Sequence, residues 1–97
     1  MDEQAKIIIL YDYYMDLFSE KQRKYFEAYY FDNLSLSEIS ENDNVSRNAV
    51  HKSIKNVVGK LYEYETKLKL YEKESRLKEI IDKIDDKEIK KELEGLL

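Results

Sequence analysis

The sequence of this 97-residue chain predicts an all-α protein, and three observations support that fold class. Proline is absent, glycine occurs only at Gly59 and Gly95, and 39% of the residues are charged, a composition that favours helices over strands and turns. Three serines, Ser19, Ser35 and Ser46, stand where helices could begin. Apolar residues recur at intervals of three and four, the spacing of helices with a buried face.

The first helix is expected over residues 3–17 and the second from Ser19 onward. Ser19 and Gln22 have the spacing of a capping box, and Asp32-Asn33 should end the second helix. The first helix would bury one face and also carries apolar residues off that face, so it needs cover on more than one side. The residues expected on the two buried faces are Ile7, Leu10, Tyr11, Tyr14, Leu17 and Phe18, and then Gln22, Tyr25, Phe26, Tyr29 and Tyr30.

The third and fourth helices are separated by a tight turn. Ser35 and Glu38 form a second capping box, and Asn44 suits the left-handed conformation that ends a short helix. The fourth helix should begin after Ser46 and continue to Tyr71 or beyond. Its apolar residues repeat at alternating intervals of three and four, as in a heptad seam, and these are Ile54, Val57, Leu61, Tyr64, Leu68 and Tyr71.

The C-terminal third is expected to be helical as well. Asp85 could cap a last short helix, with Glu88 at its third position. We therefore divide the chain into a domain over residues 1–70, which includes the long fourth helix, and a C-terminal helical extension over residues 71–97. The apolar side of the last helix would be Ile89, Leu93, Leu96 and Leu97.

Two short helices joined by a tight turn indicate a helix-turn-helix, in which the second helix is the recognition helix. Four residues should form the internal contact between the two helices, and Ser40 is small enough for their close approach. Those four are Ile39, Val45, Val50 and Ile54.

The outward face of the recognition helix is the candidate nucleic-acid-binding site. Residues 46–60 carry four Lys or Arg and no acid, whereas residues 1–45 carry four against ten Asp or Glu. Arginine and asparagine can pair with base edges, lysine neutralises phosphates, and a serine at a helix start can bind a phosphate. The expected site residues, called here the basic stripe, are Ser46, Arg47, Asn48, His51, Lys52 and Lys55.

Other functional classes find little support. The chain has one histidine and no cysteine, so a thiol nucleophile or a zinc–thiolate site is excluded and His51 has no partner for a metal site. Asp85 and Asp86 are adjacent on a helix and do not converge. We expect neither an enzyme, a metal nor a cofactor. No long apolar segment or signal peptide is present, so a cytoplasmic protein without membrane insertion is expected.

Residues 5–55 closely resemble the YlxM-like family of small bacterial helix-turn-helix proteins, through "LYDYY", "EKQ…YF", "YYFDNLSLSEIS" and "NVSRNAVH" together. The resemblance implies a middle region similar to region 4 of bacterial sigma factors, with its recognition helix over residues 47–58. We also expect the fold to be winged helix-like and DNA-binding. It also implies a regulatory role in the signal recognition particle pathway, because the family's genes lie beside those of the particle. Ser40 and Asn48 depart from the family's usual residues.

Two functions and two assembly states stay open. The chain could be a DNA-binding regulator, or a protein–protein adaptor of the signal recognition particle machinery that contacts its protein or RNA. The stripe could also be a solvated face, and the tyrosines could simply pack the core. The first helix has apolar residues on more than one side, and the heptad seam of the fourth helix is long. Both predict a homodimer, unless the C-terminal helices cover the seam.

Overall fold

The computed structural model describes all 97 residues as helices and connecting turns, with no strand. The all-α prediction is therefore confirmed. The winged helix-like expectation is wrong, because a wing is a β-hairpin and none follows the recognition helix. The helices are α1 (Glu3–Tyr14), α2 (Glu20–Tyr30), α3 (Leu36–Asp43), α4 (Arg47–Leu68), α5 (Leu70–Ile81) and α6 (Lys87–Glu94), with a 3-10 turn, η1 (Met15–Leu17), after α1.

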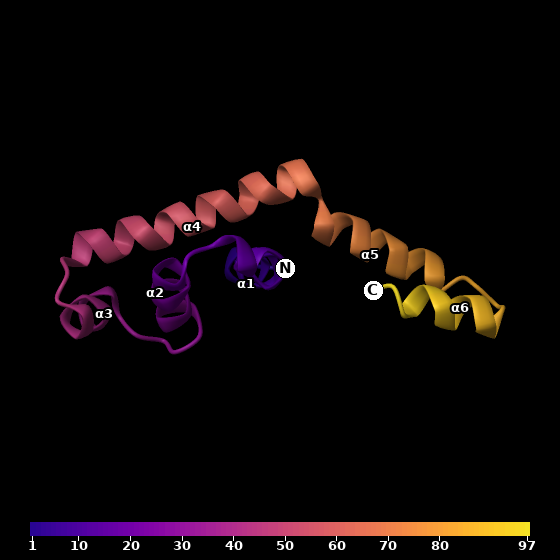
Figure 1. Cartoon of the computed structure of the whole chain (residues 1–97), viewed down its shortest axis with the longest axis horizontal. Helices are drawn as coiled ribbons and strands as arrows, with labels where there is room; N and C mark the ends of the chain where they lie inside the picture. Colours follow the sequence, from indigo (N-terminus) through magenta and orange to yellow (C-terminus); the bar gives the residue numbers. More distant parts are fainter.

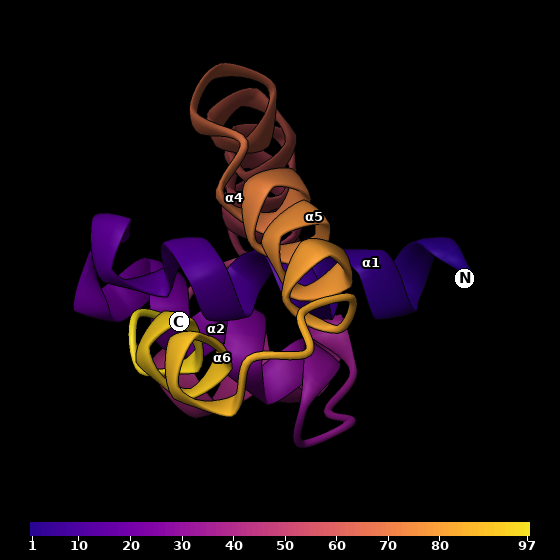
Figure 2. The same ribbon diagram turned by 90° about the vertical axis from the view of Figure 1, so that its right-hand side faces the viewer.

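The molecule consists of a head and an arm, and it measures 57 × 24 × 24 Å. In the head, α1, α2 and α3 all lie on one side of α4 (Figure 1). The arm is the hairpin of α5 and α6, which extends beyond the far end of α4. Viewed along the long axis, α1 runs across the width of the molecule (Figure 2).

The core of the head forms where α1 and α2 meet the middle of α4. Eight buried residues make its main cluster, and stacked rings at its centre join Tyr11 to Phe26 at 4.0 Å between centroids. Leu17, expected on the buried face of the first helix, is 55% exposed, because the helix tightens into η1 at Met15 and its side-chain direction shifts. The cluster is Ile7, Leu10, Tyr11, Tyr14, Phe18, Phe26, Val57 and Leu61.

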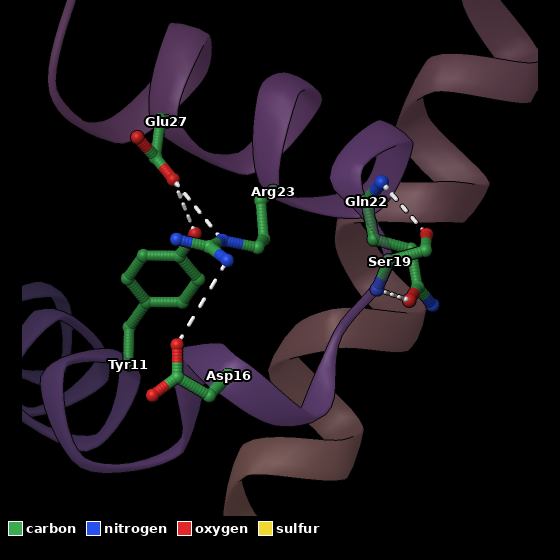
Figure 3. Close-up of polar contacts among 6 residues, drawn as sticks. All are labelled: Tyr11, Asp16, Ser19, Gln22, Arg23 and Glu27. Atoms are coloured by element: carbon green, nitrogen blue, oxygen red, sulfur yellow. Dashed lines mark hydrogen bonds and ion pairs between the residues drawn. The ribbon is translucent and has the colours of Figure 1, made fainter.

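A polar network fixes α1 to α2 at the edge of this core (Figure 3). The Tyr11 hydroxyl donates to the Glu27 carboxylate at 2.6 Å, and the Arg23 guanidinium lies 3.9 Å from both Glu27 and Asp16. Burial, followed by the neighbouring Glu27 carboxylate, raises the pKa of Tyr11 to about 12. The tyrosine therefore stays a neutral donor, which suits a ring whose body is buried and whose hydroxyl reaches the rim.

The three serine starts are confirmed. The Ser19 and Ser35 hydroxyls accept hydrogen bonds from the backbone N–H groups of Gln22 and Glu38, three residues on. The Gln22 and Glu38 side chains in turn accept from the backbone N–H groups of Ser19 and Ser35. Ser46 accepts from the Ala49 N–H at 3.0 Å. These bonds satisfy N–H groups that a helix start leaves without partners, so the local sequence alone sets where α2, α3 and α4 begin.

The fourth helix ends at Leu68, before the expected Tyr71. Lys69 adopts the left-handed conformation at φ 56°, and the chain starts α5 in a new direction. The Glu65 carboxylate accepts from the Tyr71 and Glu72 N–H groups, each at 3.1 Å, and so caps α5 from the preceding helix. Neither Lys69 nor this long-range cap follows from the heptad spacing, which simply continues through the break.

The arm contains little buried surface. Ile81 is 2% exposed, whereas Ile80 is 46% and Ile89 49% exposed. The cap of α6 is Asp86, which accepts from the N–H groups of the second and third residues after it, and Asp85 is not the cap. Helix α6 therefore begins one residue later than the sequence pattern predicted. None of the helices combines the length and the apolar character that a transmembrane span requires.

Candidate nucleic-acid interface

The helix-turn-helix contact forms as predicted between α3 and the first half of α4. Ile39, Val50 and Ile54 are buried in one cluster with Tyr25 from α2, and Val45 packs against them. The turn between the helices is held by Asn44, which adopts the left-handed conformation at φ 54°. Asparagine tolerates this conformation better than most residues, so the turn is encoded locally.

Ser40 occupies the close approach between the two helices. It is buried at 8% exposure, and its hydroxyl donates to the Ser37 carbonyl at 2.8 Å. The Ser40 carbonyl in turn accepts the Val45 N–H at 3.1 Å. The hydroxyl is therefore satisfied within its own helix, so the departure from the family's usual residue leaves no buried polar atom without a partner.

The buried side of α4 determines which of its residues face outward. Val50, Ile54 and Val57 point into the head and are almost fully buried. The residues between them on the opposite side are exposed, since a helix that buries one face shows the other. All six predicted site residues are exposed, at the start of α4 or along its first half: Ser46, Arg47, Asn48, His51, Lys52 and Lys55.

Arg47, Lys52 and Lys55, the three cations of the stripe, have no acidic partner within 4.0 Å. Further along the same helix, Lys60 and Lys67 both pair with Glu63, at 3.2 and 3.0 Å. The stripe thus presents uncompensated positive charge on the first half of α4. Free cations at a helix surface can replace the counterions of a phosphate backbone.

Ser46 contributes the start of the recognition helix. Its side-chain oxygen already accepts the Ala49 N–H, and a serine hydroxyl can still donate its own hydrogen. The N–H groups of the first turn and the helix dipole also favour an anion at this end. Ser46 can therefore bind a phosphate without giving up its role as a cap.

Acidic side chains lie on the helix that precedes the stripe in the chain. Glu38 and Glu41 are exposed on α3, the other helix of the motif. Hydrogen bonds from Ser35 hold the pKa of Glu38 below its usual value, so this carboxylate is charged near neutral pH. Such charges restrict how a polyanion can approach α3, and they leave α4 as the electrostatically favourable surface.

An open hollow of about 650 Å³ borders the stripe and brings residues from other elements beside it. His51 and Lys55 form one wall, and Tyr29 and Asn33, from α2 and the loop after it, lie across from them. Sequence reasoning placed Tyr29 on the buried face, yet it is 39% exposed. A helical pattern cannot reveal this, because the exposure depends on how α2 crosses α4.

Residues 1–96 match the UPF0122 family, described as "Putative helix-turn-helix protein, YlxM / p13 like". The chain belongs to this family. The UPF0122 protein of Fusobacterium nucleatum is 43% identical over all of this chain and 98% of its own length. The UPF0122 proteins of Halalkalibacterium halodurans and Oceanobacillus iheyensis are 46% and 42% identical, over 86% and 87% of this chain and 83% and 80% of their own.

The UPF0122 match confirms the resemblance to the YlxM-like family, and extends it to the C-terminal arm. The family is described by its fold, and a helix-turn-helix is typical of regulatory proteins that are not enzymes. No group of three or more His, Cys, Asp or Glu side chains is placed to hold a metal ion.

Proposed function

We propose that this UPF0122 protein is a non-enzymatic DNA-binding regulator that uses the basic stripe of α4. The observation that carries the proposal is the set of three unpaired cations on the exposed side of a helix whose opposite side anchors a helix-turn-helix. Arg47 and Asn48, at the start of α4, are suited to read base edges in the major groove. Lys52 and Lys55 lie further along and are suited to bind phosphates.

Titration of a fluorescent duplex at several salt concentrations tests the proposal. We expect affinity to fall steeply as salt rises, because each neutralised phosphate releases counterions. Lys52→Ala and Lys55→Ala should each weaken binding and reduce the salt slope by about one. Lys60→Ala is the matched control, since this lysine lies beyond the stripe on α4 and pairs with Glu63. Absence of binding at low salt would overturn the proposal.

A second candidate function is an adaptor for the signal recognition particle, and the charge and apolar distribution of the surface favours it. Residues 1–45 carry ten acids against four cations, which limits the attraction of nucleic acid to the stripe. The arm also exposes apolar side chains, including Leu70 at 43% and Leu96 at 79%, as protein-binding surfaces do. Recovery of the particle's GTPase or RNA by the tagged chain, in the absence of DNA binding, would favour this function.

We also propose that the protein acts as a homodimer in the cytoplasm. A single helix-turn-helix binds weakly, and two-fold dimers place two recognition helices on successive turns of DNA. Sedimentation at several protein concentrations tests this point separately from DNA binding. A monomer at every concentration would overturn it.

A further inference from the structure

Helix α1 has a second apolar side that the head covers only in part. Ile8, Ile9 and Met15 on this side line a groove of about 490 Å³, together with Phe31 from the end of α2 and Tyr71 from α5. Phe31 is 50% exposed, although its ring contacts Tyr11 and Phe26 edge-on. An apolar groove of this kind, between α1 and the arm, is unusual on a small protein unless a partner fills it.

The two walls of the groove carry different charges. Asp12 stands on the α1 wall with no cation within 4.0 Å. Lys78 stands on the α5 wall, where its ammonium group forms an ion pair with the Glu74 carboxylate at 3.4 Å. A helix that fits the groove therefore needs an apolar face with a cation along the edge that meets Asp12.

Helix α6 of this same chain has that pattern. Ile89 and Leu93 share one face of α6, Leu96 and Leu97 follow the end of the helix at Glu94, and none of the four is buried. At about 100° per residue, Lys90 flanks one edge of this face and Glu92 flanks the other. Neither has an ion-pair partner within 4.0 Å.

We propose that α6 of a second copy of this chain fills the groove between α1 and α5, and that the exchange is reciprocal. The charges select one of the two directions in which the helix can lie. In that direction Lys90 meets Asp12 and Glu92 meets the Lys78 wall, whereas the reverse direction pairs like charges. A two-fold axis makes two such contacts, as closed dimers require. This inference rests on the proposed homodimer and not on DNA binding.

The chain's own α6 is a poorer occupant because it already covers Ile81. The short turn after α5, residues 82–86, holds α6 against α5, and Ile81 is 2% exposed. Moving α6 into its own groove would uncover this side chain. A second copy can bring its α6 with the hairpin intact, using Ile89 on the helix and Leu97 after its end, which are 49% and 45% exposed.

Charge reversal measured by sedimentation of the full chain tests the contact. Asp12→Lys and Lys90→Glu should each raise the dimer dissociation constant about tenfold, because each places like charges together. The double variant should return it to within about threefold of the wild type. Lys91→Glu is the matched control, since Lys91 lies on the opposite side of α6, and it should leave the constant unchanged. Ile89→Asp should raise it by at least about thirtyfold.

The absence of cysteine from the chain permits a second test by disulfide crosslinking. A tagged Asp12→Cys chain mixed with an untagged Lys90→Cys chain should give a product containing one of each. A chain that carries both substitutions should likewise link to a second chain, giving a covalent dimer.

Three results would overturn the proposal: a wild-type monomer at all concentrations, charge reversals without effect, or a double-cysteine chain that closes on itself. Circular dichroism establishes that each variant keeps its helices. Lys52→Ala distinguishes a failure of this proposal from a failure of the proposed DNA binding. It should weaken DNA binding and leave the dissociation constant of the dimer unchanged.

Discussion

The head and the arm are built from similar helical sequence, yet they differ in how that sequence is buried. Of the 14 buried residues, 13 lie in the head, within residues 1–68, and one, Ile81, lies in the arm. In the head, three helices pack against one side of α4 and close a core there, whereas α6 in the arm packs against α5 alone (Figure 1). The stability of the arm therefore depends on capping and on whatever covers its exposed face.

The largest expected effect is at the centre of the head. Phe26→Ala removes a fully buried ring stacked on Tyr11, and it should lower the free energy of unfolding by about 3–5 kcal/mol. Urea denaturation measures this. Ile89→Ala in the arm, at 49% exposure, should cost under about 1 kcal/mol at concentrations where the chain is monomeric. Equal costs would mean that the arm belongs to the same cooperative core.

Alkaline pH provides the next comparison. The pKa values of Tyr11 in the head and Tyr13 beside the arm are both raised to about 12, first by burial and then by the carboxylates of Glu27 and Glu74. The unfolded chain ionises these tyrosines near pH 10, so their stabilisation is complete below pH 10 and is lost as the pH rises toward 12.

Phenylalanine at each position separates the two contributions to alkaline unfolding. Thermal melts between pH 9 and 12 should show a shallower loss for Tyr11→Phe and for Tyr13→Phe than for the wild type. We expect Tyr11→Phe to act on global unfolding and Tyr13→Phe on the arm alone. Unchanged pH profiles in both variants would contradict the raised pKa values.

The junction between head and arm should respond to Glu65→Gln. Its carboxylate accepts from the Tyr14 hydroxyl at 2.6 Å and from two N–H groups at the start of α5, and an amide cannot replace both oxygens as acceptors. We expect a local cost of about 1–3 kcal/mol, seen as faster hydrogen exchange at Tyr71 and Glu72. Glu63→Gln, which changes only surface ion pairs, is the control.

The smallest effect should come from two of the three left-handed residues, Lys69 and Asn44. Lys69→Gly removes the steric cost of a side chain in this conformation, but it also raises the entropy of the unfolded chain, which offsets part of the gain. We expect a net stabilisation of the junction of about 0.5 kcal/mol. Asn44→Gly in the head should change stability by less, because asparagine already tolerates the conformation. A destabilised Lys69→Gly chain would show that the lysine side chain itself holds the junction.

Much of the head could be predicted from the sequence, because its signals are local. The serine caps, the turn at Asn44 and the buried partners Ile39, Val50 and Ile54 follow from short-range rules, and the structure bears them out. The stripe on α4 follows too, since the buried side of a helix determines its exposed side. The errors lie at Leu17, at Tyr29, at the end of α4, at the cap of α6 and in the expected wing.

By itself, the sequence determined that this protein is helical, where its first helices begin, and which side of α4 carries positive charge. These depend on spacing within a few residues, where capping bonds and the helical period act. Only the tertiary structure decided that α4 stops at Lys69, that Tyr29 is exposed beside His51, and that α1 keeps a groove open toward the arm. Those features depend on Glu65 reaching the next helix and on the angles at which helices cross, and both join residues that no local pattern connects.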